Sequence, residues 1–191
     1  MLNNLEKYDV VLGSNSPRRR ELLNDMGVKF RVEDIKGIDE SYPASLPVEE
    51  IPVFLARVKA QGHPLSANEL LITADTVVVL DEAVLGKPLG NEDAHRMLRA
   101  LSGRAHRVIS GVCVTTANRT ESFSDTSVVH FAELTDEEID YYIEHYRPLD
   151  KAGAYGIQEW IGNIGISGIN GDFYNVMGLP TRKLYQVLKS F

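Results

Sequence analysis

The chain has 191 residues, which suits a single domain, with or without two lobes, that buries a full hydrophobic core. Its hydrophobic content of 43% and charged content of 25% are ordinary for a soluble globular protein, and no apolar run approaches the ~20 residues that span a bilayer. The formal net charge of −7 disfavours a nucleic-acid polymer as a partner, but it allows a small anion where basic residues gather locally.

Two further features predict a cytoplasmic protein. The first seven residues lack the charged-then-apolar form of a signal peptide. The single cysteine, Cys113, lies in an apolar run and cannot form an internal disulfide. Both features favour a reducing compartment.

The first strong signal lies at residues 14–20, after an apolar run at 8–12 that predicts a buried strand. Ser16 is a favoured helix N-cap, Pro17 suits the first helical position, and Gly27 is expected to end the helix. The free amides of the first turn attract anions, and arginine binds phosphate through paired hydrogen bonds. Cations are disfavoured beside a helix N-terminus, so the arginines at 18–20 indicate a phosphate-binding loop rather than a merely solvated face.

A second strand is predicted at residues 29–34, followed by an acidic loop at 37–41 that contains Glu40. A helix is expected to start near Pro52 and to bury an apolar stripe. Lys59 lies at the edge of that stripe. It is either a surface lysine whose stem covers apolar side chains or a cation aimed into a cleft.

Residues 70–80 form a β-branched run that we expect to be broken at 74–76, before a hairpin turn at 81–82. Asp75 stands out within this apolar run. It either marks a turn or bulge, or carries a charge that needs a partner such as a metal or a lysine. The cost of burying an unpaired charge favours the partner.

The rest of the chain mixes helices with antiparallel strands. A helix is predicted at 91–101, a hairpin of strands at 107–116 and 122–131, and a helix that starts with a capping box at Thr135 and stops at Pro148. Seven of the fifteen glycines lie between residues 153 and 178, where they suit tight turns or close approach to a ligand, and a final helix follows. This order predicts an α/β fold with a mixed sheet.

The charged residues without an obvious structural role form a chemically coherent set. Arginines and lysines neutralise polyphosphate, carboxylates hold a divalent cation or orient a water, and Thr76 and Gln158 can read a base without adding charge. Together these side chains supply the groups needed to break a phosphoanhydride bond of a nucleotide. Taken singly, each has an ordinary explanation: Lys87 could belong to a hairpin, and Lys151 could be a solvated loop charge.

Several segments together resemble the Maf family. They are SNSPRR (14–19), ADTV (74–77), GKP (86–88), LSG (101–103), KAGAYGIQ (151–158), GD (171–172) and VMGLP (176–180). The resemblance covers nearly the whole chain. It implies a single two-lobed domain over residues 1–191, with an extended, curved mixed sheet flanked by helices, a central cleft and an architecture like that of inosine triphosphatase.

The resemblance also implies an activity: release of pyrophosphate from a nucleoside triphosphate, with Mg²⁺ or Mn²⁺ as cofactor, by a protein that frequently forms a homodimer. No membrane and no nucleic-acid polymer is expected as a partner. Asp75 is implied as the essential acidic residue, and Glu40 and Asp75 are the candidate metal contacts. The implied catalytic residues are Asp75, Glu40, Lys59 and Lys87, and the implied substrate-binding residues are Ser14, Ser16, Arg18, Arg19, Thr76, Lys151 and Gln158.

Within the family, Arg18, Thr76 and Gln158 occupy the positions that mark the branch acting on dTTP and UTP. Two residues depart from the family pattern: Arg147 stands where an acidic residue is common, and Glu159 stands where glycine is usual, beside the expected base reader Gln158. Two alternatives stay open. One is a pyrophosphatase for 7-methyl-GTP or another purine triphosphate, and the other is a nucleotide-binding regulator of cell division.

Overall fold

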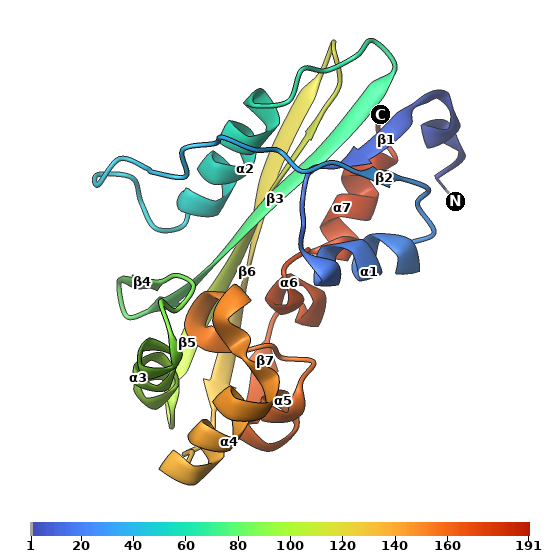
Figure 1. Cartoon of the computed structure of the whole chain (residues 1–191). Coiled ribbons are helices and arrows are strands. Elements are labelled where there is room, and N and C mark those ends of the chain that lie inside the picture. The colour runs from blue at the N-terminus through green and yellow to red at the C-terminus, as the bar shows by residue number, and fades with distance from the viewer. Residues whose placement is uncertain (1) are drawn as a thin grey trace. The chain divides into compact units, whose positions relative to one another are not determined.

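The computed structural model describes residues 2–191 and contains helices on a mixed sheet (Figure 1). In chain order the elements are η1 (Asn3–Lys7), β1 (Asp9–Leu12), α1 (Pro17–Asp25), β2 (Arg31–Val32), α2 (Ile51–Gln61), β3 (Glu69–Leu80), β4 (Ala83–Leu85), α3 (Asn91–Leu101), β5 (Ala105–Thr115), β6 (Thr120–Phe131), α4 (Asp136–Tyr146), η2 (Pro148–Asp150), η3 (Ala152–Ala154), α5 (Trp160–Gly165), β7 (Ile166–Asn170), α6 (Phe173–Met177) and α7 (Thr181–Leu188). No helix among these residues is both long and apolar enough to cross a bilayer.

The sheet has seven strands in the order β2-β1-β3-β5-β6-β7, with β4 paired to β3 outside that path. Strand β1 runs parallel to β2 and β3, whereas β4 is antiparallel to β3 and β7 is antiparallel to β6. The predicted mixed α/β sheet is therefore confirmed. The two parallel pairs, β1–β2 and β1–β3, lie near the beginning of the chain, where helices separate the strands.

The chain forms two compact units from interleaved segments. Unit 1 contains the residues up to Asp75 together with Ser110–Asp125 and Gly178–Phe191, and unit 2 contains Thr76–Ile109 and Thr126–Met177. Strands β3, β5 and β6 each contribute residues to both units. Because β3 changes unit between Asp75 and Thr76, two adjacent candidate site residues belong to different units.

Unit 1 is built around close packing of α2 on the sheet. Val11 of β1, Leu71 of β3 and Cys113 of β5 form a buried cluster with Ala56 and Ala60 of α2. These alanines are small enough for the helix to lie close to the strands. Figure 1 shows α2 on one side of β3, with α1 and α7 on the other.

Gly111 of β5 marks the point of closest approach between that strand and α2. A Cβ atom at Gly111 would lie 2.2 Å from the carbonyl carbon of Pro52. No side chain fits there, so glycine at this position lets the helix backbone contact the strand directly.

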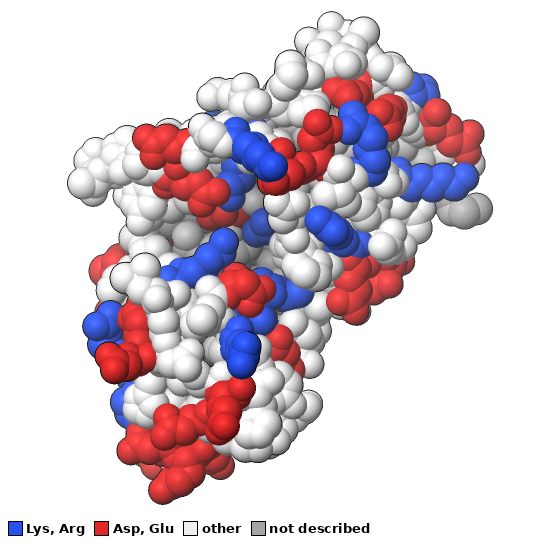
Figure 2. Space-filling model, viewed as in Figure 1, with Lys and Arg blue, Asp and Glu red and all other residues white. Residues whose placement is uncertain are grey.

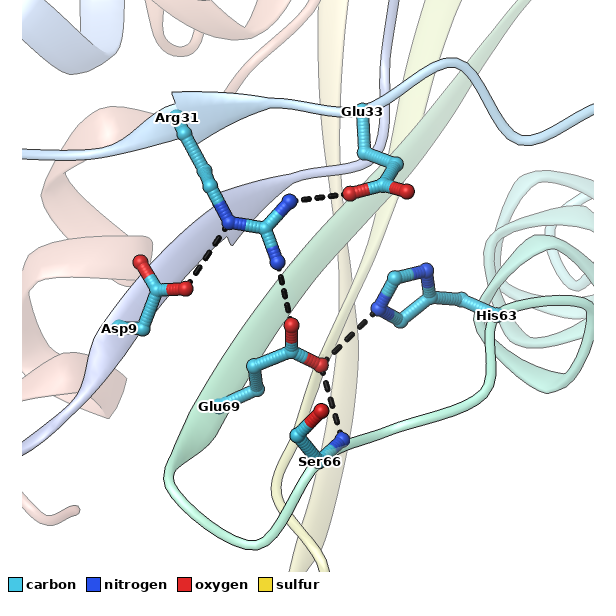
Figure 3. A network of polar contacts seen from close by, with 6 residues as sticks. All are labelled: Asp9, Arg31, Glu33, His63, Ser66 and Glu69. Atoms are coloured by element: carbon cyan, nitrogen blue, oxygen red, sulfur yellow. Dashed lines mark hydrogen bonds and ion pairs between the residues drawn. The ribbon is translucent and has the colours of Figure 1, made fainter.

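A polar network joins the beginnings of β1 and β3 in unit 1 (Figure 3). The Arg31 guanidinium bonds the carboxylates of Asp9, at 2.9 Å, and of Glu33 and Glu69. Glu69 also accepts hydrogen bonds from the Ser66 amide at 2.9 Å and contacts His63 Nε2 at 3.1 Å. The Ser66 amide, more than any other group, lowers the pKa of Glu69 below its ordinary value.

Unit 2 contains the helix that was predicted from the capping box. The Thr135 hydroxyl accepts from the Glu138 amide at 3.2 Å, and the Glu138 carboxylate accepts from the Thr135 amide at 2.8 Å. The first turn of α4 is acidic, and Figure 2 shows acidic side chains gathered at the lower end of the view, where Figure 1 places α4. This surface would repel a polyanion.

A cluster of aromatic rings is buried in unit 2. The rings of His106, Phe131 and Tyr155 pack edge to face with centroid separations of 4.9 to 5.4 Å. His106 Nε2 lies 2.7 Å from the Tyr155 hydroxyl. Burial lowers the pKa of His106 to about 4.

Two details of the predicted strands are wrong. Strand β3 is continuous from Glu69 to Leu80 instead of broken at 74–76, because Asp75 has a partner within reach of an unbroken strand, as shown below. The second strand is only Arg31–Val32, and both residues are exposed, so little burial extends the pairing.

Candidate active site

The loop after β1 forms the predicted start of a helix. Ser16 is the N-cap of α1, and its hydroxyl accepts from the Arg19 amide at 3.5 Å, with Pro17 in the first position. The Ser14 hydroxyl accepts from the Ser16 amide at 3.3 Å. Gly27 adopts a positive φ of 72° just after the helix, which glycine tolerates better than other residues. The local signals in this segment are confirmed.

Arg19 turns its guanidinium toward the protein backbone. Its Nε donates to the Gly178 carbonyl and its Nη1 to the Ala74 carbonyl, each at 2.9 Å, and Nη1 also donates to the Ser14 hydroxyl at 3.3 Å. Burial lowers the pKa of Arg19, while the charge of Asp75 raises it. Arg19 therefore ties the loop after β1 to β3, immediately before Asp75. Arg18 lies in the first turn of the same helix and is partly buried.

Asp75, Lys59 and Glu40 meet in unit 1. Lys59 Nζ lies 2.6 Å from Asp75 Oδ1 and 3.2 Å from Glu40 Oε1. The side chains of Lys59 and Asp75 are only 16% and 17% exposed, whereas Glu40 is 56% exposed. The structure thus shows that Asp75 has a lysine partner within a regular strand, and that Lys59 points its ammonium at two carboxylates.

Thr73 is a site residue that the sequence reasoning missed. Its buried hydroxyl donates to the Ala56 carbonyl of α2 at 2.6 Å. Thr73 and Asp75 lie two apart on β3, so they share a face of the strand, and Ala56 and Lys59 lie three apart on one face of the helix. The hydrogen bond of Thr73 therefore fixes the position of α2 along β3, so that Lys59 lies beside Asp75. A threonine two residues before an unexplained aspartate was the available signal.

Glu40 and Asp75 suit a divalent cation only with help from a ligand. Among residues 2–191, no group of three or more histidine, cysteine or acidic side chains could hold a metal. Mg²⁺ is commonly bound by one or two carboxylates, with substrate phosphates and water supplying the remaining oxygens. The two carboxylates around Lys59 Nζ match that donor set.

In unit 2 the loops that carry Lys87 and Lys151 are joined. The Gly153 amide donates to the Gly86 carbonyl at 3.0 Å. The backbone of Lys87, the next residue, therefore lies close to the turn that follows Lys151. Gly153 has a φ of 68°, and a Cβ atom there would lie 3.0 Å from the Val78 side chain. Lys87 itself is exposed.

Lys151 is buried among acidic groups. Its Nζ lies 2.8 Å from Asp150 Oδ1 and 3.1 Å from Glu159 Oε1, and its side chain is 9% exposed. The other Glu159 oxygen accepts from the Tyr142 hydroxyl, and that hydroxyl accepts from the Gly156 amide at 3.0 Å. The ordinary alternative for Lys151, a solvated loop charge, does not hold, because its side chain is 9% exposed and paired with two carboxylates.

Gln158 lines a hollow of about 490 Å³ in unit 2, together with Ile157, Gly162, Asn163, Ile166, Ser167, Gly168, Ile169 and Phe173. Gln158 is exposed, whereas the neighbouring Glu159 turns to Lys151 and Tyr142. The carboxylate that departs from the family pattern therefore binds a lysine and a tyrosine inside the unit. The other departure, Arg147, ends α4 in the left-handed conformation with a φ of 46°.

The family model described as Maf-like protein matches residues 9–191. The chain belongs to the Maf family. The resemblance found in the sequence motifs is thereby confirmed. The motif residues of this Maf protein are divided between the units: Ser14, Ser16, Arg18, Arg19, Glu40, Lys59 and Asp75 lie in unit 1, and Thr76, Lys87, Lys151 and Gln158 lie in unit 2.

Relatives of this Maf protein carry a common name. A protein of Phocaeicola vulgatus named dTTP/UTP pyrophosphatase is 56% identical over 191 residues, which cover 99% of each chain. A Parabacteroides distasonis protein of the same name is 56% identical over 193 residues and covers both chains completely. A third, from Porphyromonas gingivalis, is 55% identical over 195 residues, covering 100% of this chain and 98% of its own.

Solved structures share the fold at low sequence identity. A HAM1 protein from Coxiella burnetii is 16% identical with a TM-score of 0.52, covering 96% of this Maf protein and all of its own chain. The Staphylococcus aureus Ham1 protein is 15% identical with a TM-score of 0.50, covering 94% of this chain and 99% of its own. The predicted fold, an extended mixed sheet flanked by helices, is confirmed by its similarity to these Ham1 structures.

In unit 1 the structure brings several of the predicted residues together. Asp75, Lys59 and Glu40 form one charged group, and Arg19 bonds the backbone directly before Asp75. In unit 2 the loops of Lys87 and Lys151 are hydrogen-bonded. The assignment of the unit 2 residues as substrate contacts stays a prediction from the motifs.

Proposed function

We propose that this Maf protein hydrolyses dTTP and UTP to the nucleoside monophosphate and pyrophosphate. The observation that carries the proposal is the Asp75 carboxylate, held 2.6 Å from Lys59 Nζ with Glu40 beside it, in a chain more than half identical to proteins of that name over its full length. A part-buried carboxylate with a fixed orientation is the kind of group that positions an attacking water.

The proposed reaction is hydrolysis of the α–β phosphoanhydride bond, and residues of unit 1 supply its proton acceptor and part of its positive charge. Water attacks the α-phosphorus, the bond from that phosphorus to the α–β bridging oxygen breaks, and pyrophosphate leaves. Asp75 accepts the proton of the water. Lys59, Arg18 and the first-turn amides of α1 stabilise the negative charge that develops on the phosphates.

A divalent cation, Mg²⁺ or Mn²⁺, fits the proposal. Glu40 and Asp75 would hold it, and when bound it would neutralise charge on the phosphate oxygens. The Lys59 ammonium lies between these carboxylates, so in the free protein it balances the charge that they would otherwise concentrate.

Lys87 stabilises the charge on the departing pyrophosphate, and Lys151 binds the substrate. Thr76 and Gln158 supply uncharged polar groups to a pyrimidine edge. Gln158 is exposed in a hollow of about 490 Å³, which leaves its amide accessible to a ligand. A cytoplasmic location and a homodimer complete the proposal. Light scattering of the purified chain tests the homodimer.

The testing experiment is a screen of pyrophosphate release across dTTP, UTP, 7-methyl-GTP, other purine triphosphates and modified pyrimidine triphosphates, with Mg²⁺ or Mn²⁺. Preferential turnover of dTTP and UTP is expected. Preferential turnover of a purine triphosphate would instead identify a purine pyrophosphatase. Tight nucleotide binding without turnover would identify a regulator, such as one acting in cell division.

A further inference from the structure

The buried ion pair between Lys151 and Glu159 is held from several sides. The Glu159 side chain is 20% exposed, and its two oxygens contact Lys151 Nζ, at 3.1 Å, and the Tyr142 hydroxyl. Tyr142 is itself fully buried, and burial followed by the hydrogen bond to Glu159 raises its pKa. The phenol therefore stays protonated and donates to the carboxylate. A carboxylate bonded at both oxygens has little freedom to move.

The backbone at Gly156 leaves space for the side chains of Lys151 and Glu159. A Cβ atom at Gly156 would lie 2.9 Å from Glu159 Cδ and 3.1 Å from Lys151 Cε. Only glycine leaves room for both side chains at this point. Glu159 directly precedes α5, yet its carboxylate does not cap that helix.

We propose that Glu159 is a positioning residue that holds the Lys151 ammonium in place for the nucleotide. The Lys151 ammonium has three N–H donors. One donates to Asp150 Oδ1 at 2.8 Å, and Nζ lies 3.1 Å from Glu159 Oε1. These two carboxylates hold the ammonium in position, and a further N–H serves the ligand. Glu159 thus acts on the nucleotide through Lys151 and does not touch it.

This inference rests on the proposed function, because it takes the nucleotide as the ligand of Lys151. The competing explanation is that the pair only stabilises the loop against α4. The two explanations differ in a measurable way. A purely structural pair changes the free energy of unfolding, whereas a positioning residue changes the KM for dTTP only while Lys151 is present.

The experiment is a double-mutant cycle with Glu159→Gln and Lys151→Met. Glu159→Gln keeps the volume and a hydrogen-bonding group for Tyr142 but removes the charge that orients Lys151. We expect it to raise the KM for dTTP about 10-fold with kcat within about 2-fold, because a contact equally strong in the ground and transition states affects KM alone. Lys151→Met should raise KM about 30-fold, in the range for a lost hydrogen bond to a charged group.

The decisive comparison is the double variant. If Glu159 acts through Lys151, adding Glu159→Gln to Lys151→Met raises KM no further. An unchanged KM in Glu159→Gln, or an equal rise in the Lys151→Met background, would overturn the inference. Circular dichroism and urea unfolding establish that each variant is folded. Asp81→Asn is the control, because it breaks the 2.8 Å pair with Arg104 in the same unit and should leave KM unchanged.

Pyrophosphate release by the wild-type chain is measured first, so that a failure of the proposed function can be told apart from a failure of the positioning role of Glu159. If the wild type releases none from any triphosphate, the proposed function is wrong. The same cycle is then measured as dTTP binding by titration calorimetry. Coupling between the two substitutions would support the positioning role, and additive effects or no dTTP binding would overturn it.

Discussion

Lys59 on α2 and Asp75 on β3 form a 2.6 Å ion pair whose two side chains are each about one-sixth exposed. Burying two charges is tolerated only where the pairing is good, and here Glu40 adds a second carboxylate at 3.2 Å. The pair depends on the height of α2 against the strand, which the Thr73 hydroxyl and the close contact at Gly111 both fix. The chemistry that we propose depends on this alignment.

Asp75→Asn is expected to reduce pyrophosphate release by about 10²–10³-fold, because the amide cannot accept the proton of the attacking water. The measurement is kcat/KM for dTTP and UTP. Asp125→Asn is a matched control: Asp125 is also 17% exposed and pairs with Lys183 at 2.7 Å in the same unit. Near-full activity of a folded Asp75→Asn variant would remove this residue from the mechanism.

Thr73→Val should lower the free energy of unfolding by about 1 kcal/mol, since it removes a buried hydrogen bond while keeping the side-chain shape. It should also lower kcat/KM, because α2 is no longer fixed at the height that aligns Lys59 with Asp75. Thr73→Ser keeps the hydroxyl and is the control for both measurements. Equal activity of the valine and serine variants would show that the hydroxyl does not align the site.

The stability of the protein should fall as the pH falls from about 6.5 toward 4 because of His106. Burial holds its folded pKa at about 4, whereas the unfolded value is about 6.5. Between these values the unfolded state binds more protons, so lowering the pH favours unfolding. From pH 7.5 to pH 5 the expected loss is about 2 kcal/mol, measured by urea unfolding. His106→Phe should flatten this slope, and an unchanged slope would assign it to other groups.

Glu69→Gln should destabilise the protein by about 1–3 kcal/mol, because a buried carboxylate loses its charged bonds to Arg31 and the Ser66 amide. Glu33→Gln removes a second contact of the same arginine at an exposed position and should cost less than about 0.5 kcal/mol. Urea unfolding separates the two variants.

Both of these variants should keep the wild-type kcat/KM. The network lies at the beginnings of β1 and β3, while Asp75 follows six residues later on β3. A large loss of activity in Glu69→Gln without a loss of stability would contradict a structural role.

The sequence alone determined the features that depend on neighbouring residues. The N-cap at Ser16, the capping box at Thr135 and the left-handed turn at Gly27 follow from local hydrogen bonding and backbone geometry, so short patterns predict them. The family followed as well, because its motifs are long and ordered. The expectation that Asp75 has a charged partner is confirmed as well, since a charge in an apolar strand needs one.

The tertiary structure decided which partner each charged residue meets. The strand was expected to break at Asp75, and it does not, because Lys59 arrives from a helix sixteen residues earlier in the chain. The carboxylate of Glu159 was expected beside the base reader, but packing against Tyr142 turns it to Lys151. Such pairings depend on how helices and loops pack on the strands. No local pattern records them, because the distance between two side chains is set by everything that packs between and around them.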